Sequence, residues 1–103
     1  MGILKKLLGI GPKTDFKALK KNGAIIIDVR SRDEYESGHI SGSKNIPLNI
    51  LKQEMKNLPK DKVIITCCAS GIRSTSARKM LLSNGFKDVH NGGGWSSLEN
   101  KIH

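Results

Sequence analysis

The chain has 103 residues, of which 37% are hydrophobic and 26% charged, and this size fits one globular domain. Lysine and arginine outnumber aspartate and glutamate by 18 to 9, so the formal net charge is +9. Such a charge favours anionic partners in general. Aromatic residues make up only 4%, which disfavours a base-stacking surface, and we expect no nucleic-acid partner. No apolar run approaches the roughly 18 residues that cross a bilayer.

Both cysteines of the chain are adjacent, at Cys67 and Cys68. A disulfide framework spaces its cysteines apart to close loops, so this pair does not indicate a disulfide-rich secreted protein. Structural zinc sites space paired ligands by two to four residues, and no second Cys or His pair follows here. We therefore expect no bound metal.

The N-terminal arm, residues 1–13, is short, basic and apolar. Lys5 and Lys6 interrupt its apolar residues, whereas a signal peptide needs a continuous apolar core. We expect a loosely packed helical arm ahead of a domain at residues 14–103. Membrane contact by the arm is the less favoured alternative, and we expect a cytoplasmic protein.

Periodicity and capping residues predict nine elements within residues 14–103. Asp15 begins the first helix, the apolar run 24–29 is typical of a buried parallel strand, and Ser31 with Glu34 has the spacing of a capping box. Helices are expected at 14–22, 31–37, 48–57, 73–84 and 95–101, and strands at 24–29, 45–47, 62–66 and 87–90. Residues 92–94, all glycine, are expected to form a flexible or tightly bent loop. The alternation of strands and helices predicts an α/β fold with a central parallel sheet covered by helices on both faces.

The segment after the second apolar strand carries the chemistry. Its cysteines lie at the carboxyl end of a predicted parallel strand, which is where α/β sheets bind ligands. Loop amides and the N-terminus of the following helix favour an anion there, including a thiolate. Arg73 adds a permanent positive charge. Composition alone favours Cys68 as a small buried hydrophobe, but the surrounding small and polar residues favour a nucleophile in an anion-binding cradle.

Residues 68–74 read cysteine-x-x-glycine-x-arginine-serine and resemble the active-site loop of the rhodanese family. The other similar segments are 28–30 (Asp-Val-Arg), 34–35 (Glu-Tyr), 38–42 (Gly-His-Ile-Ser-Gly), 45–48 (Asn-Ile-Pro-Leu), 85–86 (Gly-Phe), Val89 and 92–95 (Gly-Gly-Gly-Trp). The resemblance covers about residues 14–101. It implies a rhodanese-like three-layer α/β/α domain with four to five parallel strands. The family's first strand is not evident at residues 12–14.

The resemblance also implies sulfurtransferase chemistry without a cofactor. Cys68 would accept a sulfane sulfur from a small anionic donor such as thiosulfate, and would pass it to cyanide or a thiol, with a sulfur-relay protein as a further possible partner. The residues that would bind the donor are Ala69, Ser70, Gly71, Ile72 and Arg73. Asp28, Arg30 and Ser74 would support the site, the first two mainly by orienting loops.

Several alternatives stay open at this point. Cys67 lies six positions before Arg73, which is the spacing of a phosphatase or arsenate-reductase loop. A non-catalytic persulfide carrier or binding module is a third reading. His39 is more typical of a loop hydrogen bond than of a general base, and Trp95 of packing than of a pocket wall. Because alternate residues of a strand face opposite sides, the two thiols are not expected to share one pocket.

Overall fold

A computed structural model describes residues 14–103, so the predicted N-terminal arm and most of segment 12–14 lie outside it. Within this range the sheet has four parallel strands in the order β2-β1-β3-β4. The strands are β1 (Ile25–Asp28), β2 (Lys44–Asn45), β3 (Ile64–Cys68) and β4 (Val89–Gly94). None of the helices in the described part is long and apolar enough to cross a membrane.

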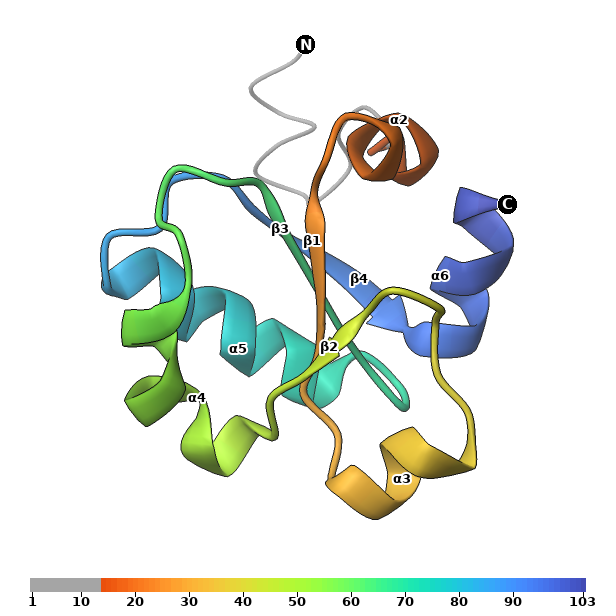
Figure 1. Cartoon of the computed structure of the whole chain (residues 1–103), viewed down its shortest axis with the longest axis horizontal. Coiled ribbons are helices and arrows are strands. Elements are labelled where there is room, and N and C mark those ends of the chain that lie inside the picture. The colour runs from red at the N-terminus through yellow and green to blue at the C-terminus, as the bar shows by residue number, and fades with distance from the viewer. Residues whose placement is uncertain (1–13) are drawn as a thin grey trace, which may run out of the picture.

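Helices cover both faces of the sheet, as the alternating pattern predicted (Figure 1). One face carries α4 (Leu48–Glu54), the 3-10 turn η1 (Met55–Asn57) and α5 (Ile72–Ser83). The other face carries α2 (Phe16–Lys21) and α6 (Trp95–Ile102), which pack against each other. The short helix α3 (Arg32–Ser37) follows β1 at the carboxyl end of the sheet. The predicted three-layer α/β fold is confirmed.

Successive side chains of the two central strands, β1 and β3, point to opposite faces of the sheet and so belong to two separate buried clusters. Ile27 and Ile64 belong to a buried cluster under α4 and α5, whereas Ile26 and Ile65 belong to a second cluster under α2 and α6. Both strands are buried almost throughout because helices cover both sides of the sheet. The register pairs Asp28 with Cys67, so the carboxyl ends of β1 and β3 lie side by side.

Local signals place the helix starts correctly. The Asp15 side chain accepts a hydrogen bond from the Ala18 amide at 3.0 Å and caps α2. Ser31 and Glu34 form the predicted capping box of α3. The predicted helix 48–57 is present, but its last turn tightens into η1.

The prediction for residues 92–94 was wrong. These glycines are the end of β4, which pairs with β3 up to Cys68 and Gly94. A Cβ atom on Gly94 would lie 2.9 Å from the Ala69 carbonyl oxygen, so only glycine lets the two backbones approach this closely. The glycine run therefore brings β4 against the loop that follows Cys68.

The second central strand, β3, also begins and ends at other residues than the sequence predicted. It was expected at 62–66 and instead runs from Ile64 to Cys68. Pairing with Asp28 continues the ladder through Cys67. Both cysteines are thus the last residues of the strand, and the site loop begins at Ala69.

Candidate active site

The Cys68 thiol lies at the carboxyl end of β3, in front of the first turn of α5. Its sulfur accepts a hydrogen bond from the Gly71 amide at 3.0 Å and another from the Ser74 amide at 3.4 Å. The Ser74 hydroxyl oxygen lies 3.5 Å from the same sulfur. Burial raises the pKa of the Cys68 thiol, but these hydrogen bonds and the Ser70 amide outweigh it, so the pKa is lowered overall.

The loop between β3 and α5 shapes this cradle. Gly71 adopts a φ of +102° at the N-cap of α5, a left-handed conformation that side-chain-bearing residues rarely adopt. That turn points the Gly71 amide back to the Cys68 sulfur. Ala69, Ser70 and Ile72 are exposed on the outside of the loop, whereas Cys68 itself has no exposed surface. Of the predicted loop residues 69–73, Gly71 and Ser70 direct their amides at the sulfur, and the Ser74 amide is an additional donor. The hydrogen bonds of the described part include none from the amides of Ala69, Ile72 or Arg73 to this sulfur.

A polar network continues from the buried Ser74 side chain to the exposed Asn91 on β4. The Ser74 hydroxyl donates to the Asn91 side-chain oxygen at 2.6 Å, and the Asn91 amide nitrogen donates to the Thr75 hydroxyl at 2.7 Å. The Gly93 backbone N–H also donates to Asn91. Sequence reasoning missed Asn91. Its only signal was its place two residues after Val89, on the same face of β4 as the α5 side of the core.

Arg73 is the second charged feature of the site, and it is already paired. Its guanidinium donates two hydrogen bonds to the Glu34 carboxylate, at 2.7 Å and 3.0 Å, across 39 positions of sequence. Glu34 also accepts from the Ser31 backbone N–H. Hydrogen bonds from Arg73 and Ser31 lower the pKa of Glu34 to about 2. The sequence indicated Glu34 only as a capping residue, so this link between α3 and α5 was missed.

Asp28 and Arg30 form a buried ion pair beside the site, as expected for an ordinary pair at the end of β1. The guanidinium contacts the Asp28 carboxylate at 2.7 Å and donates to the Gly38 carbonyl oxygen at 2.7 Å. It also lies 4.8 Å from the centre of the Trp95 ring, a cation–π distance. The pair therefore connects β1 to the end of α3 and the start of α6, and Trp95 packs against the core beneath α6.

Cys67 faces the opposite side of the sheet from Cys68. It belongs to the apolar cluster under α2 and α6, together with Ile65 and Leu98, and it has no exposed surface. Burial, with the Asp28 carboxylate nearby, raises the pKa of the Cys67 thiol to about 12. The two thiols therefore lie in different surroundings.

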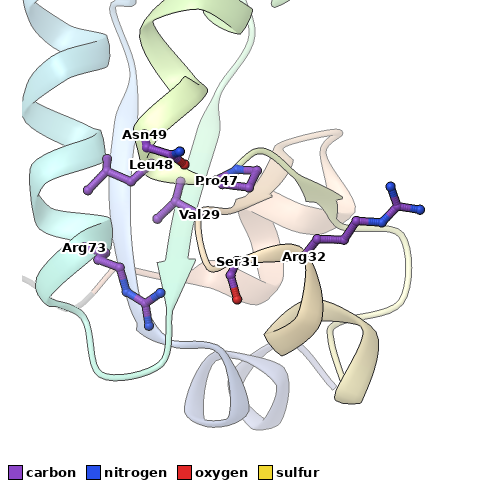
Figure 2. A pocket seen from close by; sticks show the side chains of 7 residues that line it. All are labelled: Val29, Ser31, Arg32, Pro47, Leu48, Asn49 and Arg73. Atoms are coloured by element: carbon purple, nitrogen blue, oxygen red, sulfur yellow. The ribbon is translucent and has the colours of Figure 1, made fainter.

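A pocket of about 440 Å³ opens next to Arg73 (Figure 2). Figure 2 shows the Arg73 side chain reaching from α5 toward the loop after β1, while the end of Arg32 points away from it. The remaining lining residues are Val29, Ser31, Pro47, Leu48 and Asn49. The pocket thus lies at the carboxyl ends of β1 and β2, where ligands bind in this class of sheet.

Two further groups have ordinary roles. The His39 and Tyr35 rings are stacked with their centroids 3.7 Å apart, and the Nδ1 atom of His39 lies 2.7 Å from the Tyr35 carbonyl oxygen. Among residues 14–103, no group of three or more His, Cys, Asp or Glu side chains is arranged to hold a metal ion.

Comparisons with known proteins agree with this geometry. The family model for the rhodanese-like domain matches residues 13–101. The uncharacterized protein YqhL of Bacillus subtilis is 40% identical over 80 residues, which are 77% of this chain and 64% of that protein. The thiosulfate sulfurtransferase GlpE of Pseudomonas fluorescens is 32% identical over 77% of this chain and 72% of its own. A solved rhodanese with anions from E. coli is similar with a TM-score of 0.68 and 30% identity, over 73% of this chain and 91% of that chain. The chain therefore belongs to the rhodanese-like domain family.

Proposed function

We propose that the protein transfers a sulfane sulfur through a persulfide on Cys68. The observation that supports this most is the cradle itself, in which amides of Gly71 and Ser74 point at a sulfur with a lowered pKa. A thiolate is the nucleophilic form of cysteine, so a lowered pKa increases the reactive fraction at neutral pH. The similarity to thiosulfate sulfurtransferases also supports sulfur transfer.

The donor half-reaction is an attack on divalent sulfur. The Cys68 thiolate forms a bond to the sulfane sulfur of thiosulfate, the S–S bond of the donor breaks, and its electron pair leaves with sulfite. The persulfide that remains on Cys68 has one sulfur more than the thiolate and keeps one negative charge. The loop amides that hold the thiolate then hold the terminal sulfur of the persulfide.

The acceptor half-reaction returns the enzyme to its starting state. Cyanide or a thiolate attacks the outer sulfur, the S–S bond breaks, and the electron pair returns to Cys68 as thiolate. Thiocyanate or a small-molecule persulfide leaves. The thiolate is a good leaving group because the cradle lowers its pKa.

Access to the sulfur requires a local movement. Cys68 has no exposed surface in the structure, so a small donor reaches its sulfur only when neighbouring groups move.

The geometry favours Cys68 over Cys67 as the nucleophile. A phosphatase or arsenate reductase that used Cys67 would need its thiolate near Arg73 and the loop amides. The Cys67 thiol instead lies in an apolar cluster on the other face of β3, where burial raises its pKa to about 12.

A steady-state assay with thiosulfate and cyanide tests this proposal. We expect the wild-type protein to form thiocyanate, Cys68→Ala to form none above background, and Cys67→Ala to keep most of the rate. Cys67→Ala is the matched control because it removes the neighbouring thiol of the same strand. Loss of activity in Cys67→Ala with retention in Cys68→Ala, or hydrolysis of an aryl phosphate by the wild type, would contradict the assignment.

A further inference from the structure

The Ser74 hydroxyl lies between two groups that compete for its proton. Its oxygen is 2.6 Å from the Asn91 side-chain oxygen and 3.5 Å from the Cys68 sulfur. A serine hydroxyl carries a single proton, so it cannot donate to both neighbours at once. In the structure the hydroxyl donates to Asn91, and the Cys68 thiol donates to the Ser74 oxygen from the other side.

Three contacts fix the orientation of the Asn91 side chain. Its oxygen accepts from the Gly93 backbone N–H at 2.9 Å as well as from Ser74, and its nitrogen donates to the Thr75 hydroxyl at 2.7 Å. The Thr75 hydroxyl in turn donates to the Gly71 carbonyl oxygen at 2.7 Å. Because a backbone N–H can only donate, the Gly93 contact identifies the Asn91 atom next to Ser74 as the oxygen. Asn91 is thus a fixed acceptor beside the Ser74 hydroxyl.

Ionisation of Cys68 changes which acceptor the hydroxyl favours. When the thiol gives its proton to water, the sulfur becomes a charged acceptor, and hydrogen bonds to charged acceptors are the stronger ones. The hydroxyl can then turn to the sulfur only by giving up its bond to Asn91. Burial raises the pKa of Cys68, and the hydrogen bond with the Ser74 side chain is the largest contribution that lowers it. The strength of the bond to Asn91 therefore affects how readily the thiolate forms.

Asn91 acts on this equilibrium without carrying a charge. The buried cluster around Cys68 is apolar and includes Leu51 of α4 and Met55 of η1. The charged and titratable side chains on the neighbouring elements are Arg73 and Arg78 on α5, Glu34 on α3, Asp28 and Arg30 at the end of β1, Asp88 and His90 at β4, and Cys67 on β3. Removal of the Asn91 side chain leaves all of these groups in place, so its effect on Cys68 passes through hydrogen bonds.

We propose that Asn91 is a positioning residue for Cys68: its side-chain oxygen holds the Ser74 hydroxyl proton away from the sulfur and so limits how strongly that hydroxyl stabilises the thiolate. The inference rests on the proposed role of Cys68 as the nucleophile. In the thiolate state the hydroxyl donates to the sulfur. Once Cys68 carries a transferred sulfur atom, the negative charge lies on the outer sulfur and the hydroxyl returns to Asn91. The hydroxyl thus changes its acceptor during one turnover, and its proton stays on Ser74.

Thiolate absorbance as a function of pH tests this role, with all variants made in Cys67→Ala so that Cys68 is the one thiol. We expect Asn91→Ala to move the Cys68 midpoint to lower pH, so that the thiolate fraction below the midpoint rises about threefold to tenfold. If Asn91 only held the loop in place, the midpoint would rise instead, because a loosened loop loses the amide hydrogen bonds to the sulfur. Asn91→Leu keeps the branched shape without the oxygen, and it should give the same result if Asn91→Ala folds poorly.

A double variant shows whether the effect passes through Ser74. In Ser74→Ala, where the hydroxyl is absent, the further change Asn91→Ala should leave the midpoint unmoved. The matched control is Thr75→Val, which removes the contact of the Asn91 nitrogen and keeps that of its oxygen, and its midpoint should stay near that of the parent. A midpoint that rises or stays in place in both Asn91 variants would overturn the role of Asn91. An equal fall without the Ser74 hydroxyl, or in Thr75→Val, would overturn it as well.

Intact mass after incubation with thiosulfate separates this inference from the proposed function. If wild type gains a sulfur atom on Cys68 and the Asn91 variants do not lower the midpoint, sulfur transfer stands and the positioning role fails. If Cys68 gains no sulfur in wild type, the proposed function fails and the inference falls with it.

Discussion

Cys67 and Cys68 are neighbours in the chain, but their thiols lie in separate clusters on opposite faces of the sheet. Their pKa values shift in opposite directions. Burial raises that of Cys67 to about 12, whereas hydrogen bonds from the loop and Ser74 lower that of Cys68 despite its burial. One position along a strand thus separates a thiol whose pKa is raised from one whose pKa is lowered.

Alkylation as a function of pH measures this difference. We expect Cys68 to react with iodoacetamide with a midpoint below about 8.5, the value of free cysteine. Cys67 should react only after unfolding, because it is covered and its pKa is raised. The Cys67→Ala variant isolates the Cys68 titration. A Cys68 midpoint at or above the free-cysteine value would show that the loop hydrogen bonds do not lower the pKa of this thiol.

Replacement of Ser74 by alanine removes the hydroxyl that lies 3.5 Å from the Cys68 sulfur. It also leaves Asn91 without the hydrogen bond that it accepts at 2.6 Å. We expect a higher Cys68 pKa, slower persulfide formation and a loss of about 0.5–1.5 kcal/mol in the free energy of unfolding, since the exposed Asn91 keeps its hydrogen bond from Gly93. Thiolate absorbance against pH and urea denaturation give the two values. Ser76→Ala, at an exposed position of α5, is the control. An unchanged thiolate titration in Ser74→Ala would show that the Ser74 hydroxyl does not lower the pKa of Cys68.

Asp28→Ala leaves the buried Arg30 guanidinium without its carboxylate. An uncompensated buried charge costs about 3–5 kcal/mol, which urea denaturation detects. Glu36→Ala breaks the exposed pair with Arg32 and should cost less than about 1 kcal/mol. Similar losses in the two variants would show that the Asp28–Arg30 pair is not the structural link described.

The Glu34–Arg73 pair makes stability depend on pH in a defined window. The folded state lowers the pKa of Glu34 from an ordinary 4.5 to about 2. The carboxylate therefore stabilises the fold fully above about pH 4.5, and this contribution is lost as pH falls toward 2. We expect wild type to be more stable than Glu34→Gln at pH 7 and the two to converge near pH 2. Urea denaturation across that range measures the difference, and a constant gap would contradict the shift.

Much of the fold follows from local patterns. The apolar run around Ile26 and the run around Ile65 require cover on both faces, which only a buried parallel strand provides. Ser31 and Glu34 set the start of α3 by a contact three residues apart. These signals depend on neighbours in the chain, so the sequence contains them.

The features that sequence reasoning missed depend on the folded chain. Glu34 reaches Arg73 across 39 positions, and Asn91 reaches Ser74 across 17. No local pattern encodes either contact. The glycines at 92–94 have weak strand propensity, and they join β4 because Gly94 must approach the Ala69 carbonyl. The resemblance located Cys68 and its loop, but it did not indicate that Arg73 is already paired.

The most direct test of the account is the position of the transferred sulfur. Wild-type protein is incubated with thiosulfate or with the persulfide of 2-mercaptoethanol, and the intact mass and the modified residue are then determined. We expect one added sulfur atom on Cys68, removed by cyanide as thiocyanate, and the same addition in Cys67→Ala. Sulfur on Cys67, or no addition from either donor, would contradict sulfur transfer through Cys68.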